Sequence, residues 1–117
     1  MTNSPIYEFL VLDKATGRVL GAGTGYRNPR HLGKAITDVV RTTRSRGYAF
    51  EDLVPECRAV EGGKLRHVAD AEAIARGEAI EGGEPRSITK AEAIAGGGAL
   101  MEWEARWRQP AAAHVPG

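Results

Sequence analysis

The first apolar segment of the chain constrains the fold most, because its apolar residues occupy both faces of a strand. Residues 6–12 read Ile-Tyr-Glu-Phe-Leu-Val-Leu and are rich in the β-branched and aromatic types that favour strands. Residues 13–17 supply a turn, in which Asp13 suits the first position and Gly17 can adopt a positive φ. A second apolar stretch begins after Arg18, so the sequence predicts a β-hairpin.

A loop of Lys14 to Gly17 sets the expected register of this hairpin, in which Leu12 faces Val19 and Phe9 faces Ala22. One face then carries Tyr7, Phe9, Val11, Leu20 and Ala22, and the other carries Ile6, Leu10, Leu12 and Val19 with Gly21, Gly23 and Gly25. Two apolar faces both need cover, from this chain or from a second copy. We therefore expect self-association, with a homodimer as the simplest form.

A long amphipathic helix is predicted over residues 29–46. Asn28 can cap its first turn, Pro29 suits the first helical position, and Gly47 is a plausible stop. One face is apolar and consists of Leu32, Ile36, Val39, Val40 and Thr43. At about 100° per residue, Arg30, Lys34, Arg41 and Arg44 fall on the opposite face, away from the core.

Charge is unevenly distributed along the chain, although the net charge is only +1. The segment from residue 27 to residue 46 has six basic residues and one acid, a local charge of +5, whereas the rest of the chain carries −4. The basic residues are Arg27, Arg30, Lys34, Arg41, Arg44 and Arg46, and we treat them as the candidate partner-binding set. A stripe of cations can match a phosphate backbone or an acidic protein surface. An ordinary solvated helix face is the competing interpretation.

The second half of the chain reads as short elements separated by glycine. Residues 57–68 predict a second hairpin that turns at Gly62-Gly63. Pro55 argues against a central strand just before it. A near-repeat of Ala-Glu-Ala-Ile predicts short helices at 71–76 and 90–95, the second with the capping-box spacing Thr89 to Glu92. Residues 81–85 form the turn between them.

Strict alternation predicts a last strand over residues 100–108. Met101, Trp103, Ala105 and Trp107 alternate with charged residues, which indicates one core-facing side and one wet side. The expected fold is α+β: an antiparallel sheet of about five strands, one long amphipathic helix and two short helices. Residues 1–109 form a single domain in this interpretation, and residues 110–117 form a flexible tail.

No motif of catalysis or cofactor binding emerges. The segment Gly21-Ala-Gly-Thr-Gly25 lacks the third glycine of a dinucleotide fingerprint, and we interpret it as a strand that another element approaches closely. Cys57 and His67 point to opposite sides of the predicted second hairpin, so Cys57 is expected to be buried. The three histidines are too scattered for a metal site, and the acids Asp70, Glu72, Glu78, Glu81 and Glu84 read as a solvated face.

Composition places the chain among ordinary globular domains. It has 117 residues, 42% hydrophobic and 26% charged, which is enough for one core without a metal or disulfide. A single cysteine fits a reducing compartment, and the sequence predicts neither a signal peptide nor a membrane-spanning segment. The expected location is the cytoplasm.

Three functional hypotheses follow. The preferred one is a non-catalytic binding protein, without cofactor or metal, whose basic helix contacts nucleic acid or an acidic protein. The alternative is an interaction or inhibitor module that acts through sheet edges and apolar patches as a homodimer. The least favoured is a small enzyme that uses residues 21–25.

Overall fold

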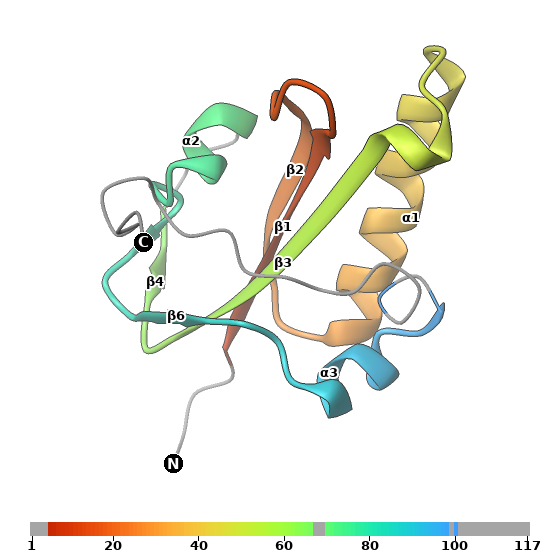
Figure 1. Ribbon diagram of the computed structural model, residues 1–117. Helices are drawn as coiled ribbons and strands as arrows, with labels where there is room; N and C mark the ends of the chain where they lie inside the picture. The colour runs from red at the N-terminus through yellow and green to blue at the C-terminus, as the bar shows by residue number, and fades with distance from the viewer. Residues whose placement is uncertain (1–4, 67–69, 99, 101–117) are drawn as a thin grey trace, which may run out of the picture.

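The fold is α+β, with a four-stranded antiparallel sheet at its centre (Figure 1). The computed structural model describes residues 5–66, 70–98 and 100. In chain order the strands of this sheet are β1 (Ile6–Asp13), β2 (Val19–Tyr26), β3 (Leu53–Glu61) and β6 (Glu84–Arg86), and they lie side by side in the order β2-β1-β3-β6. A second ladder of two strands joins β4 (Lys64–Leu65) to β5 (Ile80–Glu81).

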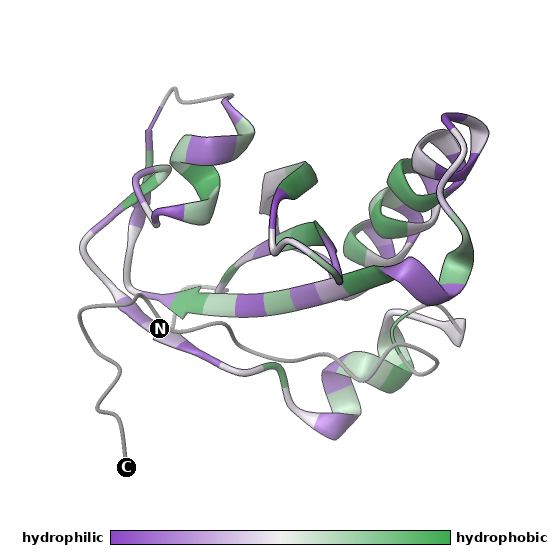
Figure 2. Ribbon diagram, turned by 45° about the horizontal axis from the view of Figure 1, so that its top comes forward, coloured by the Kyte–Doolittle hydropathy of each residue, from purple (hydrophilic) through white to green (hydrophobic). Residues whose placement is uncertain are grey.

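Helices cover the sheet on both faces (Figures 1 and 2). The long helix α1 (Pro29–Ser45) packs over β1 and β2 on one face, and α3 (Lys90–Ala95) packs beside α1. The opposite face carries α2 (Ala71–Ala75), which contacts the same two strands. A 3-10 turn, η1 (Phe50–Asp52), leads into β3. The two apolar faces of β1 are therefore covered by this chain itself.

The predicted N-terminal hairpin is confirmed, but its register is different beyond the turn. Leu12 faces Val19 as expected, whereas Phe9 faces Gly23 and Leu10 faces Ala22. A bulge at Leu20 adds one residue to β2, so Ala22 packs with Leu10 on the α2 face. The expectation that Ala22 shares a face with Phe9 was therefore wrong.

The predicted second hairpin is wrong as well. Gly62-Gly63 does not turn β3 back on β4; instead one antiparallel ladder runs through both strands and pairs them with residues 80–86. Val60 faces Pro85, and four residues later Lys64 faces Glu81, with no change of register. The paired strands bend where Gly62-Gly63 lies against Gly82-Gly83, a site we call the glycine crease. A Cβ on Gly83 would lie 2.7 Å from the Gly63 amide nitrogen, so only glycine lets the two backbone segments approach this closely.

Pro55 is accommodated inside β3 because of the sheet's outline. It faces Val11 of β1, while β6 pairs only with residues 59–61 on the other side of β3. Among the described residues, Pro55 therefore has an unpaired side on which a missing N–H is tolerated. The short helices are confirmed, with α2 ending one residue before the predicted end and the Thr89–Glu92 capping box in place. The predicted strand over 100–108 and the tail over 110–117 lie, apart from Leu100, outside the described residues.

Candidate functional site

The helix that carries the basic segment forms where its sequence signals place it. The Asn28 side chain accepts a hydrogen bond from the Arg30 amide at 2.9 Å, and Pro29 occupies the first turn. Gly47 adopts a φ of 105° just after the helix, which ends it. Leu32, Ile36 and Val40 are buried against the sheet, as predicted. This anchoring fixes which side chains α1 presents to solvent.

Four cations point away from the core along α1: Arg30, Lys34, Arg41 and Arg44 are all exposed. Arg44 lies fourteen positions after Arg30, so the four side chains extend over about 21 Å of helix at 1.5 Å per residue. The first turn contains no acidic residue. Among the described residues, Arg41 is the only one of the four in an ion pair, with Asp38 at 3.8 Å, and both side chains are more than half exposed. An exposed ion pair of this kind contributes little to stability. We call Arg30, Lys34, Arg41 and Arg44 the basic face.

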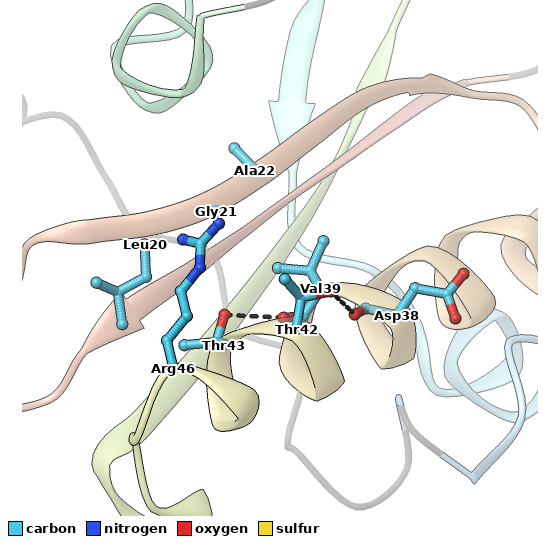
Figure 3. A pocket seen from close by; sticks show the side chains of 8 residues that line it. All are labelled: Leu20, Gly21, Ala22, Asp38, Val39, Thr42, Thr43 and Arg46. Atoms are coloured by element: carbon cyan, nitrogen blue, oxygen red, sulfur yellow. Dashed lines mark hydrogen bonds between the residues drawn. The ribbon is translucent and has the colours of Figure 1, made fainter.

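The other two predicted residues lie elsewhere. Arg27 is exposed and precedes the helix, in the loop from β2. Arg46 follows the last turn on the flank of α1 that faces β2, and its side chain extends toward Gly21 (Figure 3). There it helps to line a shallow groove, which we call the β2–α1 groove, formed by Leu20, Gly21, Ala22, Asp38, Val39, Thr42, Thr43 and Arg46. The six cations are thus not one continuous cluster.

The glycines of residues 21–25 serve packing. A Cβ on Gly21 would lie 2.5 Å from Cγ1 of Val39, and one on Gly23 would lie 2.4 Å from the Phe9 ring. Their absent side chains let α1 and the ring of Phe9 approach β2, which is the close approach predicted from the sequence. β2 is an antiparallel hairpin strand, unlike the parallel strand that precedes a dinucleotide loop.

The remaining sequence candidates are the cysteine, the histidines and the acidic residues. Cys57 is buried, as expected, and burial raises the pKa of its thiol to about 12. His67 and His114 lie outside the described residues. Within residues 5–66, 70–98 and 100, no three metal-binding side chains cluster closely enough to hold an ion. The five acids are exposed, as predicted: Asp70, Glu72, Glu78, Glu81 and Glu84.

A buried ion pair is the feature that the sequence interpretation missed. Glu8 of β1 is 1% exposed and Arg58 of β3 is 7% exposed, and they face each other in the register of the two strands. The Glu8 carboxylate accepts hydrogen bonds from Arg58 Nε and, at 2.7 Å, from Thr24 Oγ1. Arg58 Nη2 donates to the Ile74 carbonyl in α2 at 2.8 Å. The sequence signal that could have indicated this pair is Glu8 itself, the one acidic residue among the apolar residues 6–12.

A second polar network fastens α3 to the sheet. Arg86 donates two hydrogen bonds to the Glu92 carboxylate, at 2.7 and 3.0 Å, and Tyr7 donates a third. The bonds from Arg86 lower the pKa of Glu92 to about 2. Burial, together with the Glu92 charge, raises the pKa of Tyr7 to about 12. These hydrogen bonds connect α3 to β1 and β6.

The functional site has to be interpreted from the structure of this chain alone. No helix in the described ranges is long and apolar enough to cross a membrane. No known protein family, curated protein sequence or solved structure matches this chain.

Proposed function

We propose that this protein is a non-catalytic binding protein whose basic face contacts a polyanion, with nucleic acid as the first candidate. The observation that carries the proposal is the alignment of Arg30, Lys34, Arg41 and Arg44 on the solvent side of a helix whose other side is buried. Packing of α1 against the sheet fixes the backbone positions of these four residues, so the helix does not have to become ordered when the partner binds.

Electrostatics explains why such a row favours an anionic partner. Four like charges along about 21 Å of helix repel one another in water, and a polyanion relieves that repulsion while releasing its condensed counterions. Three of the four are arginines, which can form two parallel hydrogen bonds to a phosphate or a carboxylate. The row is straight, because it follows one helix, and it therefore suits an extended backbone of regularly spaced charges.

The same chemistry permits an acidic protein surface as the partner, and the two partners differ in what they require. Phosphates along a duplex recur at short, regular intervals, so several cations of one row can each meet a phosphate. An acidic protein must instead place carboxylates at matching positions. No aromatic side chain lies in the row, which disfavours recognition of single strands by base stacking.

A salt titration tests the proposal. Binding to a fluorescent DNA duplex is measured by anisotropy over a range of salt concentrations, for the natural protein and for the variant Arg30→Gln/Lys34→Gln/Arg41→Gln/Arg44→Gln. If each residue meets one phosphate, the variant flattens the slope of log affinity against log salt by about 3.6, at roughly 0.9 per contact. The fold should survive, because the four side chains are exposed.

A matched control separates position from charge. The variant Lys14→Gln/Arg18→Gln/Lys64→Gln/Lys90→Gln also removes four exposed cations, none of them in α1. It should keep most of the salt-dependent affinity. Equal loss in both variants would mean that net charge alone attracts the DNA, and unchanged binding by the α1 variant would refute the proposal. Retention on poly-glutamate without affinity for DNA would assign the partner to acidic protein.

The proposed compartment is the cytoplasm, where nucleic acids and acidic proteins are both available. The single cysteine of the chain, Cys57, is a buried free thiol, and a lone cysteine fits a reducing environment.

A further inference from the structure

The outer edge of β2 is a second candidate interaction surface, separate from the basic face. In the four-stranded sheet β2 lies at the end of the order, and no strand among residues 5–66, 70–98 and 100 pairs with its outer side. An edge strand of this length exposes backbone N–H and C=O groups that can pair with another strand. The β2–α1 groove runs beside this edge (Figure 3).

We propose that two copies of this chain pair through their β2 edges, side by side and antiparallel, with their α1 helices in contact across the two-fold axis. The two four-stranded sheets would then join into one continuous sheet of eight strands. Each protomer offers the same surface to the other, as a two-fold interface requires.

Charge fixes where the axis must lie. Asp38 and Arg46 stand at opposite ends of the β2–α1 groove, eight residues or about 12 Å apart along α1. Thr42 lies midway between them on the same flank. An axis that passes beside Thr42 therefore places Arg46 of each protomer opposite the partner's Asp38, forming two ion pairs between copies.

The strand gives an independent position for the same axis. Register shifts at Leu20 and between Gly23 and Tyr26 interrupt β2 on either side, so the part that pairs with β1 in one unbroken register is residues 21–23. The middle of this part is Ala22. The side chain of Val39 packs against Gly21, and the side chain of Arg46 extends toward Gly21 (Figure 3). Thr42 lies between Val39 and Arg46 along α1, so it lies beside the start of this segment, and the two positions for the axis agree to within roughly one strand residue.

The helices would also be correctly spaced. Because α1 packs over both β1 and β2, the helix axis lies about half a strand spacing from β2 on the side toward β1. The two-fold axis of the proposed dimer lies half a strand spacing from β2 on the opposite, outer side. With strands about 4.8 Å apart, the two helix axes would be about 10 Å apart, which is the distance at which helices pack. Thr42 is small and exposed, and its hydroxyl bonds to the Asp38 carbonyl at 3.0 Å, so it presents no bulk at the contact.

A charge-reversal cycle tests the pairing. Sedimentation velocity across a concentration series should show a monomer–dimer equilibrium for the natural protein. Asp38→Arg and Arg46→Asp should each weaken dimerisation by at least about tenfold, because each creates two like-charge contacts. The double variant should restore dimerisation. A monomer at about 0.5 mM, a dimer that both single variants leave unchanged, or a double variant as weak as the single ones would overturn the proposal.

A crosslink provides a second readout that does not depend on charge. Thr42→Cys should form a disulfide-linked dimer under mild oxidation, because the two cysteines would face each other at the axis. Arg44→Cys, on the basic face of the same helix, should not. The natural thiol does not interfere, because Cys57 is buried. Equal crosslinking of the two variants would place the contact elsewhere.

Discussion

Removing Arg58 should destabilise the protein more than removing any exposed cation. The variant Arg58→Met leaves the Glu8 carboxylate, 1% exposed, without its charged partner in the core. Breaking a buried pair in this way costs about 3–5 kcal/mol. That is a large share of the roughly 5–15 kcal/mol by which a domain is stable. The hydrogen bond to the Ile74 carbonyl, which ties α2 to β3, is lost as well.

The double variant Glu8→Leu/Arg58→Met separates the pair's geometry from its charge. Replacing both partners by apolar side chains of similar size removes the stranded charge, so most of the stability should return. Thr24 loses its acceptor but is not fully buried, and this loss should cost about 1 kcal/mol. We expect the double variant to be within about 2 kcal/mol of the natural protein.

Urea unfolding followed by circular dichroism measures both effects. With a slope of about 2 kcal/mol per M, Arg58→Met should lower the midpoint by about 2 M, and the double variant by less than about 1 M. A cost below about 1 kcal/mol for Arg58→Met would show that Glu8 is not desolvated. The single variant Glu8→Leu completes the cycle. If the costs of Glu8→Leu and Arg58→Met simply add in the double variant, the two residues do not interact.

Two further predictions concern the glycine crease and the contact between α3 and the sheet. Gly83→Ala should cost at least about 2 kcal/mol of stability, because Gly83 combines a φ of 80° with a Cβ position 2.7 Å from the Gly63 nitrogen. Gly62→Ala should cost about 1 kcal/mol, because Gly62 has a φ of 77° but open space around its Cβ position. Equal melting temperatures of the two variants would contradict the close approach at the glycine crease. The hydrogen bonds to Glu92, of which those from Arg86 are the strongest, lower its pKa from 4.5 to about 2, so they stabilise the fold above about pH 4.5, and this stabilisation is lost as the pH falls toward 2. Glu92→Gln should flatten the dependence of unfolding free energy on pH in that range, and a profile as steep as that of the natural protein would assign the dependence to other acids.

Local signals account for the elements that the sequence predicted correctly. The Asp13–Gly17 turn, the Asn28-Pro29 helix start and the Thr89–Glu92 capping box each act within a few residues, so their chemistry can be read without knowing the rest of the fold. The basic face follows from the same kind of reasoning, because burying Leu32 and Ile36 forces the cations outward.

Contacts between distant segments account for the errors. A Gly-Gly pair between apolar stretches favours a hairpin, and the competing structure depends on Gly82-Gly83, twenty residues away. The one-residue bulge at Leu20 changes which face Ala22 occupies, although nothing near Ala22 in the sequence marks it. Arg46 was grouped with the other cations by its position in the chain, whereas the helix turns it toward β2.

The Glu8–Arg58 pair also decides how β1 and β3 align. Most strands are aligned by alternation, since a slip of one residue would turn their apolar side chains into water. β1 is buried on both faces, so that penalty is weak for it. A slip by two residues would set the Glu8 carboxylate opposite Glu56 or Val60, with a like charge or no partner. The ion pair thus selects one alignment among several that hydrophobic burial would accept, and a variant with an apolar pair there should fold stably but sample shifted pairings, visible as doubled amide resonances in β1.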